Sequence, residues 1–517
     1  MNLHMKMAVA VASLAGAAVL LPGPASATPT QLVIPAIPGV AALPGIAAPT
    51  ATPAATMQAL TAKPDVAVAG TKFTLSGAGL PANEDVTLTW GTANVTWVVD
   101  ARPDSVDYLG RSASKLNVIL GSVHTDSSGA FRKSFVAPRD FGGIHDIYAV
   151  VNGKQIAKGG FLIARSALMT PAKGPIGTMI TVRYDGLGSS LYEGGASLLY
   201  DNKFTGAVMA NWTRGTAIMH IRAAGPVGRH TVEVADAISF KYLNIQQSPI
   251  PWGTGKVMSF TVTKDNGRPK ARIDWPNHVT PTLDAKTTLQ LLSTSSAASA
   301  SLSSTSGAVN SALSISATGL AANTPVDLEW STVVGNRVNC TGTCWTFVSV
   351  PLGTPTTDAN GRVTSKISVP DGLGGWHVVQ VIQNGQVKAQ TPYYVKRSID
   401  GKGVSSLVLH AGQKFTVHLQ GLGWTQLDNT IAVDYDNSYV GYGCGFNSQG
   451  DTVMNLVATG APGTHLIDMY PLLYTQQPSY ANTPYGMIPV LTYEQDAPGL
   501  ALGYELPAIR LAITVVK

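Results

Sequence analysis

The 517-residue chain has little charge and few cysteines. Charged side chains make up 13% of it, against roughly a quarter in an average protein. Its 35 basic and 30 acidic residues give a formal net charge of +5 and form no dense basic stripe. Because nucleic-acid binding needs clustered lysine and arginine, the sequence excludes a nucleic-acid partner. The 53 glycines, with many serines and threonines, are instead typical of β-rich extracellular proteins with many turns.

The sequence also lacks the short motifs of common catalytic and metal sites. It contains no HExxH, no HxH and no Cys/His cluster with metal-ligand spacing. A Gly-x-Ser-x-Gly elbow, a paired-carboxylate signature and a phosphate loop are missing as well. We therefore predict no catalytic residue, no metal and no cofactor, and we expect that the protein is not an enzyme.

Sustained helical periodicity is a third feature that is missing. Short runs such as residues 72–76 and 85–90 instead alternate apolar and polar side chains. This alternation is typical of strands with one buried face. We expect few helices.

A long apolar run lies at the N-terminus. Lys6 precedes apolar residues 7–21, and Ala25-Ser26-Ala27 has the A-x-A form of a cleavage site. We predict a signal peptide at 1–27, followed by a Pro/Ala-rich linker at 28–56. The apolar run is too short to span a bilayer comfortably. The mature protein is therefore expected to be secreted or at the cell surface, with no membrane span after signal cleavage.

The clearest feature that is present is an internal repeat. The pattern Gly-Leu-x-Ala-Asn-x-x-Val-x-Leu-x-Trp starts at Gly79 and again at Gly319, 240 residues later. The pattern Asp-x-x-Gly, then Pro-x-x-x-Gly-Gly-x-His, starts at Asp126 and returns 232 residues later at Asp358. Two copies at nearly constant spacing indicate that one unit was duplicated.

A second unit follows each copy of the first. Gly-Leu-Gly at 186–188 and Tyr-Asp-Asn at 200–202 return 235 residues later, at 421–423 and 435–437. The order of the repeats is therefore A-B-A′-B′, and a two-domain module was duplicated.

The repeats divide the mature chain into four units. Unit A covers 57–165, unit B 166–265, unit A′ 306–397 and unit B′ 398–517, and a Ser/Thr-rich linker covers 266–305. Short strands at regular spacing within units of about 100 residues predict β-sandwiches. Because the linker lacks the apolar pattern needed to bury itself, we expect a flexible hinge there.

These strand and turn motifs resemble the immunoglobulin-like (Ig-like) repeats of secreted bacterial proteins, the IPT/TIG-like and related groups. The resemblance covers all four units and implies an all-β fold, a tandem array of four Ig-like β-sandwich domains in A-B-A′-B′ order. It also implies an exported non-enzymatic surface or matrix protein for adhesion or structural spacing. A cell-surface glycan or an extracellular protein would be its partner.

Two alternative functions stay open. One is a carbohydrate-binding protein that uses the Tyr-rich B′ unit, and the other is a hydrolase or oxidase with a site in B′. The motifs bear on fold more than on function, so they do not decide between these classes.

Each unit carries one equivalent histidine near the start of a late strand. These are His145, His230, His377 and His465. Because they belong to separate units, we expect each to bond a neighbouring loop and not to act as a catalytic or metal-binding group.

Asp126 and Asp358 each lie three residues before a glycine, so we expect them to bond the turn backbone of a hairpin rather than calcium.

All three cysteines lie in the second half of the chain. Cys340 and Cys344 bracket a three-residue turn, and export favours oxidation, so we predict a disulfide between them. Cys444 is then unpaired, and His465 and Asp468 are its candidate catalytic partners. Residues 465 and 468 would point to opposite faces of one strand, which argues against that role.

Tyrosine is unevenly distributed, with nine of the 17 in unit B′. Aromatic rings among amide side chains suit sugar rings or a protein partner. We therefore predict a ligand-binding surface on the Tyr- and Pro-rich extension of B′, at Tyr470, Tyr474, Tyr480 and Tyr485. The alternative is that these rings pack the extension against its own sandwich.

Overall fold

The computed structural model describes residues 57–102, 105–190, 193–236, 241, 243, 255–277, 283, 288–294, 297–335, 345–475 and 486–517. The predicted signal peptide and the 28–56 linker lie outside these residues. Within them the chain is almost entirely β, with one short 3-10 helix and no α-helix. None of the helices found there could cross a membrane. The prediction of an all-β fold is confirmed.

The strands of unit A form one connected set of eight, in the order β5-β4-β7-β8-β1-β3-β6 with β2 beside β8. Alternate side chains of these strands, including Leu88 and Trp90, are fully buried. The strands are β1 (Gln58–Lys63), β2 (Val66–Ala67), β3 (Lys72–Gly77), β4 (Asp85–Arg102), β5 (Ser105–His124), β6 (Phe131–Val136), β7 (Gly143–Val151) and β8 (Lys154–Ile163).

Unit B has two sheets, β10-β16-β15-β12-β13 and β14-β11-β9. Its strands are β9 (Ser166–Thr170), β10 (Lys173–Gly174), β11 (Met179–Asp185), β12 (Gly195–Tyr200), β13 (Lys203–Met209), β14 (Thr216–Arg222), β15 (Gly228–Ala235) and β16 (Lys256–Val262). Unit A′ also has two sheets, β18-β20-β23 and β19-β25-β24-β21-β22. Its strands are β18 (Ser299–Leu302), β19 (Ser306–Ala308), β20 (Ala312–Thr318), β21 (Asp327–Gly335), β22 (Trp345–Gly353), β23 (Val363–Ser368), β24 (Gly375–Gln383) and β25 (Gln386–Lys396).

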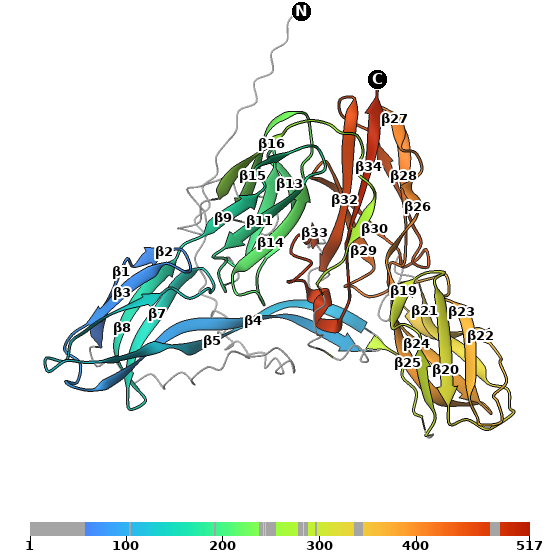
Figure 1. Ribbon diagram of the computed structural model, residues 1–517, viewed down its shortest axis with the longest axis horizontal. Helices are drawn as coiled ribbons and strands as arrows, with labels where there is room; N and C mark the ends of the chain where they lie inside the picture. Colours follow the sequence, from blue (N-terminus) through green and yellow to red (C-terminus); the bar gives the residue numbers. More distant parts are fainter. Residues whose placement is uncertain are drawn as a thin grey trace, which may run out of the picture. The chain divides into compact units, whose positions relative to one another are not determined.

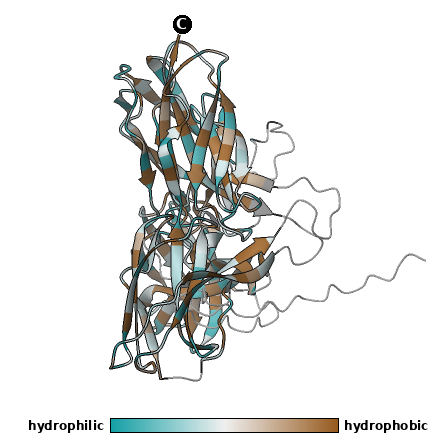
Figure 2. Ribbon diagram, turned by 90° about the vertical axis from the view of Figure 1, so that its right-hand side faces the viewer, coloured by the Kyte–Doolittle hydropathy of each residue, from teal (hydrophilic) through white to brown (hydrophobic). Residues whose placement is uncertain are grey.

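Unit B′ has a three-stranded sheet, β26-β28-β31, and a seven-stranded sheet built on β17-β34-β32-β29-β30. Its elements are β26 (Ser398–Val404), β27 (Val408–His410), β28 (Lys414–Gln420), β29 (Thr430–Tyr435), β30 (Ser438–Cys444), β31 (Thr452–Val457), β32 (Gly463–Thr475), β33 (Gly486–Pro489), the 3-10 helix η3 (Pro498–Leu502) and β34 (Ala508–Val516). Strand β17 (Arg272–Asp274) comes from the linker. Hydrophobic and hydrophilic residues interleave along the strands (Figure 2), as their alternation in the sequence predicts.

The turns predicted at Asp126 and Asp358 form, but they are not hairpins: β5 pairs with β4 and β6 with β3, and in A′ β22 pairs with β21 and β23 with β20. Asn152 and Gly153 join β7 to β8 with φ values of 50° and 75°, as a type I′ turn requires. Asp126 Oδ1 accepts hydrogen bonds from the backbone N–H groups of Ser128 at 2.8 Å and Ala130 at 2.9 Å. Asp358 Oδ1 accepts the equivalent two bonds in A′. These aspartates close turns, as expected.

Strands β4 and β5 have 18 and 20 residues, and their counterparts β21 and β22 have nine described residues each. Only Thr87–Trp90 of β4 pair with β7, whereas all of β4 pairs with β5. From Gly91 onward the two strands therefore form a two-stranded ribbon (Figure 1), which we call the arm. The strand pattern of the sequence does not predict this ribbon.

The described residues of the 266–305 linker bond to units A′ and B′, whereas its composition predicts a flexible hinge. Residues 272–274 form β17 and pair with β34 at the edge of the B′ sheet. Arg268 Nη1 donates hydrogen bonds to Thr514 Oγ1 at 2.8 Å and to Leu407 O at 3.3 Å in B′. At the other end, the Gln390 side chain in A′ bonds the backbone of Leu292 in both directions. Polar groups thus hold this segment to its neighbours without an apolar pattern.

Units B and B′ share one hydrophobic core. The cluster around Tyr184 and Phe260 of B also contains Leu466, Tyr470 and Tyr493 of B′. The two halves of the chain therefore pack against each other through a common apolar interior.

Candidate functional site

In units A and A′ the equivalent histidine stacks on the tryptophan of the first repeat motif. The ring centroids are 4.5 Å apart for His145 and Trp90, and 4.7 Å apart for His377 and Trp330. The two nitrogens of His145 bond the backbone carbonyls of Gly91 and Phe141, at 2.7 Å each. Burial lowers the pKa of the His377 imidazole to about 4. The expectation that these histidines bond neighbouring loops is confirmed.

In units B and B′ the histidine stacks on the tyrosine of the Tyr-Asp-Asn motif and pairs with its aspartate. His230 Nδ1 lies 2.6 Å from Asp201 Oδ2, and His465 Nδ1 lies 2.5 Å from Asp436 Oδ2. Burial lowers the pKa of His465, but the hydrogen bond and charge of Asp436 outweigh burial, so the pKa is raised above its usual value. Both ring nitrogens of each histidine are engaged, which leaves no free nitrogen for general-base chemistry.

The candidate catalytic group of B′ is not assembled. Cys444 lies opposite Thr430 at one end of β29, whereas His465 follows the far end, beyond Tyr435. At 3.3 Å per residue the two are separated by about 20 Å along the sheet. The exposed Cys444 therefore has no histidine base in His465.

Asp468 has a structural role between B and B′. Its carboxylate lies 2.5 Å from Arg222 Nη2 of unit B and 3.3 Å from Arg510 Nη1 of B′. Asp434 lies directly opposite it in the strand ladder and is fully buried. Burial, followed by the charge of Asp468, raises the pKa of Asp434 well above its usual value. This polar cluster joins two sheets, and none of its residues lines the three depressions described below.

The predicted ligand-binding tyrosines are only partly within the described residues. Tyr470 is fully buried, its hydroxyl accepts a 2.7 Å hydrogen bond from Arg510 Nη1, and the guanidinium lies 4.8 Å from its ring centre. As a surface contact, Tyr470 was predicted wrongly, because B packs over it. The backbone of Tyr474 pairs with Met487 in β33. Tyr480, Tyr485, Cys340 and Cys344 lie outside the described residues, so their predicted roles stay predictions.

The described end of the B′ extension is a packing element. Tyr493 and Tyr504 are buried, as are all residues of η3. Asp496, also fully buried, accepts hydrogen bonds from Trp97 Nε1 of the arm at 2.7 Å and from the Trp212 N–H of unit B at 3.1 Å. We call this contact between A, B and B′ the clasp, made of Trp97, Trp212, Thr213 and Asp496.

The clasp holds a buried acid. Burial raises the pKa of the Asp496 carboxyl to about 6, although hydrogen bonds from Trp97 and from the backbone of residues 211–213 favour the charged form. The sequence contains no signal for this contact, because Trp97 and Asp496 are 399 residues apart.

The end of the arm reaches unit A′ as well as B′. Val99 and Val106 share an apolar cluster with Tyr394 of A′ and with Leu427 and Tyr504 of B′. The backbone N–H of Tyr108 donates a 3.0 Å hydrogen bond to Gln426 Oε1. The arm of unit A thus contacts the three other units.

The repeated glycines meet at the A–B and A′–B′ junctions. The Gly142 N–H donates to Leu187 O at 2.8 Å, and the Gly374 N–H donates to Leu422 O at 2.9 Å. A Cβ at Gly142 or Gly374 would lie only 1.8 Å from the carbonyl oxygen of Gly186 or Gly421. Glycine is required here for the close approach of two backbones.

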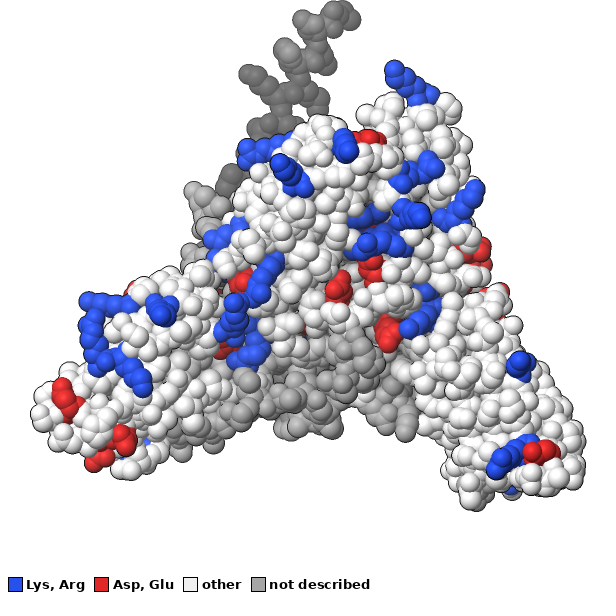
Figure 3. Space-filling model, in the orientation of Figure 1, with Lys and Arg blue, Asp and Glu red and all other residues white. Residues whose placement is uncertain are grey.

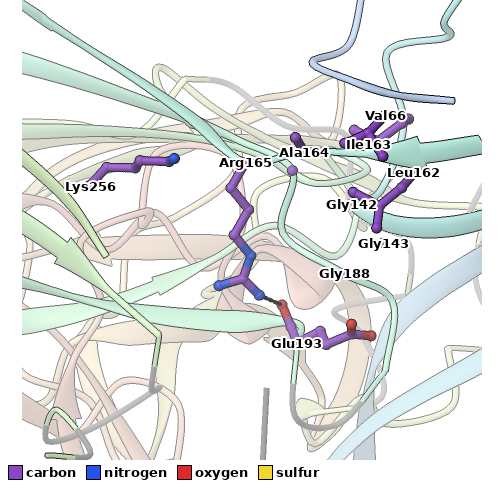
Figure 4. Close-up of a pocket in the computed structure, with 11 residues that line it drawn as sticks. Val66, Gly142, Gly143, Leu162, Ile163, Ala164, Arg165, Gly188, Glu193 and Lys256 are labelled. Atoms are coloured by element: carbon purple, nitrogen blue, oxygen red, sulfur yellow. Dashed lines mark hydrogen bonds between the residues drawn. The ribbon is translucent and has the colours of Figure 1, made fainter. Parts of the chain in front are cut away.

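Two depressions flank the A–B junction on either side of Glu193. The smaller, about 220 Å³, is lined by Arg165, whose guanidinium points to the Glu193 carbonyl, and by Lys256 (Figure 4). The larger, about 550 Å³, lies where the arm leaves the sheet, and we call it the arm groove. Its lining includes Gly91, Lys115, Asn117, Asp146, Tyr148, Gln155 and Glu193.

A third depression, about 420 Å³, lies between B and B′ and contains Asp201, Asp265 and Asp436. Each of these carboxylates already accepts hydrogen bonds from histidine, threonine or backbone groups. No group of three or more potential metal ligands occurs in the described part of the chain. On the face shown in Figure 3, charged residues are spread among uncharged ones.

Comparisons with known proteins give little. No family model matches the chain, and no curated protein is similar to it. An E. coli alpha-2-macroglobulin structure matches at 8% identity and a TM-score of 0.16, over 87% of this chain and 30% of that chain. This chain thus spans less than a third of that protein.

Two other solved structures are similar at the same level. A putative membrane anchored protein from Corynebacterium diphtheriae matches at 10% identity and a TM-score of 0.18, over 89% of this chain and 91% of that one. The N-terminal four Ig domains of Dscam1 match at 9% identity and a TM-score of 0.15, over 89% of this chain and 100% of that one. Scores this low carry no argument about function.

Proposed function

We propose that the protein is an exported, non-enzymatic scaffold that holds its Ig-like units in fixed relative positions at a cell surface or in a matrix. The observation that carries this proposal is the clasp, together with the apolar contacts of the arm. A simple string of sandwiches would need neither a ribbon that reaches three other units nor a carboxyl buried between them.

The contacts of the histidines and of Asp468, side chains that could act in acid–base chemistry, support the same role. The equivalent histidines stack on aromatic rings and bond backbone or aspartate oxygens. Asp468 joins two arginines across the B–B′ contact. Fixed hydrogen bonds of this kind serve rigidity, and they leave these groups without the freedom that acid–base catalysis needs.

The sequence alternatives are weaker on this geometry. Carbohydrate binding through B′ cannot use Tyr470, because that side chain is fully buried. An enzyme built on Cys444, His465 and Asp468 is disfavoured because Cys444 lies far from His465 and Asp468 pairs with Arg222. The described residues of B′ therefore offer no support for carbohydrate binding through B′ or for an enzyme with a site there.

Export is tested by protease treatment of intact producing cells, with a cytoplasmic marker protein as the control. The scaffold proposal expects the chain in the medium or digested at the surface while the marker survives. Recovery of the intact chain only from lysed cells would contradict it. A Cys444→Ser variant should show the same location and the same thermal stability as the parent chain.

A further inference from the structure

The arm groove is a polar depression of a size that ordinarily accepts small ligands. At about 550 Å³ it falls within the range of roughly 300–1,000 Å³ for ligand pockets. It is lined by β4, β5 and β7 of unit A and by Ser189 and Glu193 of unit B. These three strands, Gln155 of β8 and one loop of unit B therefore form its walls.

Asn117 on β5 supplies an unused amide. Its side chain is only 8% exposed, and no hydrogen bond joins it to another described residue. Its Oδ1 lies over Gly91, whose missing side chain leaves room there, since a Cβ would come within 3.4 Å of that oxygen. Its amide atoms are reached by solvent in the groove, so a bound ligand would replace water as their hydrogen-bond partner.

Glu193 supplies an unused acceptor at the other side. Its Oε2 accepts a 2.7 Å hydrogen bond from the Ser190 hydroxyl, whereas its Oε1 is buried and has no partner among the described residues. The Asn117 amide and this buried Glu193 oxygen, neither bonded to a described residue, thus line one groove.

The remaining charges of the groove are nearly balanced. Asp146 lies 3.0 Å from Lys158 Nζ and accepts a 2.8 Å hydrogen bond from the Tyr148 hydroxyl. Exposed Lys115 offsets Glu193. Such a groove favours a neutral ligand over a strongly charged one.

Unit A′ shows that this groove is a specific feature of unit A. The counterparts of Gly91 and Tyr148 are Ser331 and Gln380, which are 5% and 3% exposed. Gln390, the counterpart of Lys158, bonds the linker at Leu292 and lies opposite Gln380 in the ladder. The linker therefore crosses the face of A′ that is open in A.

We propose that the arm groove binds a neutral saccharide. Sugar hydroxyls both donate and accept, so they match an amide that offers both and a carboxylate that accepts. The half-buried Tyr148 ring supplies an aromatic surface of the kind that sugar rings stack on. The inference goes beyond the scaffold role and does not depend on it, because none of these residues belongs to the clasp.

The test uses the full mature chain on an array of immobilised neutral and uronic-acid oligosaccharides. Asn117→Ala removes the unused amide, and Gly91→Ser fills the groove with the residue that A′ has. Gln155→Ala is an additional variant that does not disturb the fold, since Gln155 is partly exposed and its side chain bonds no described residue. Ser349→Ala is the matched control, because Ser349 pairs with Ser331 as Asn117 pairs with Gly91.

The proposal expects the parent chain and Ser349→Ala to retain neutral oligosaccharides. Asn117→Ala, Gly91→Ser and Gln155→Ala should weaken retention by about tenfold or more, the effect of losing one hydrogen bond. Retention of no saccharide, preference for uronic acids, or binding by both Asn117→Ala and Gln155→Ala that equals the parent's would each overturn it. Binding that survives in Gln155→Ala but fails in Asn117→Ala still supports it when melting temperatures match.

Discussion

The carboxyl of Asp496 is the most unusual group of the clasp, because it is fully buried while it bonds the arm and unit B. Its pKa of about 6 lies above the usual 3.8. Between these two values the unfolded chain has lost the proton and the folded chain keeps it. The free energy of unfolding therefore falls as pH rises from about 4 to about 6 and is unaffected by this group above that window.

Asp496→Asn should remove this pH dependence. The difference in free energy of unfolding between parent and variant should change by roughly 3 kcal/mol at most across the window, since each pKa unit is about 1.4 kcal/mol. Urea unfolding at pH 4, 5, 6 and 7 measures it. A difference that is constant over this range would show that Asp496 stays ionised when buried.

The pKa values of the A′ and B′ histidines should lie on opposite sides of the usual value of 6.5. His377, whose pKa burial lowers to about 4, stays neutral at pH 6, whereas His465 beside Asp436 keeps its proton above pH 6.5. The pair in B′ therefore contributes stability that is full below pH 6.5 and is lost as pH rises through the raised pKa. Two-dimensional NMR of the imidazole nitrogens measures both. Asp436→Asn should lower the pKa of His465 and leave His377 unchanged.

At the scale of elements, the A–B junction depends on backbone contact between repeated glycines. A Cβ at Gly142 would meet the Gly186 carbonyl oxygen at 1.8 Å, while a Cβ at Gly160 has no atom nearer than 3.9 Å. We expect Gly142→Ala and Gly374→Ala each to destabilise the chain by a few kcal/mol, because the backbones must separate. Gly160→Ala is the control and should change thermal unfolding little. Equal melting temperatures for Gly142→Ala and Gly160→Ala would contradict the close approach.

Some elements could be predicted from the sequence and others could not, for physical reasons. The Asn152-Gly153 turn and the Asp126 and Asp358 turns follow from local conformational preference. The arm could not be predicted. Apolar and polar side chains continue to alternate beyond Gly91 as in any strand, so the sequence does not show that pairing with β7 stops at Trp90.

The candidate site residues were harder still to predict. The sequence around Tyr470 does not distinguish a buried tyrosine from an exposed one. The ring is buried by unit B, which is far away along the chain. Asn117 and Glu193 line one groove only after the arm and unit B pack together. A comparison of A with A′ does contain a signal, since Gly91 replaces a residue that is Ser331 in the other copy.

At the scale of the whole molecule, B and B′ are joined by a shared apolar core and by the Arg222–Asp468 contact. Cleavage within the linker should therefore leave the halves associated. After limited proteolysis, native size-exclusion chromatography should give one species that contains both fragments, and they should separate only in denaturant. Two separate peaks under native conditions would show that the halves are independent, as the sequence alone predicts.

The central claim is that the arm fixes the units relative to one another. The most direct measurement is the distance distribution between spin labels at exposed Ser134 of A and Lys366 of A′, with the three native cysteines replaced by serine. The account predicts one narrow distribution in this background. It should broaden when Trp97→Ala removes the hydrogen bond to Asp496 and Tyr108→Ala removes the ring that packs against both apolar clusters of the arm. A broad distribution before these two changes, or no change after them, would contradict it.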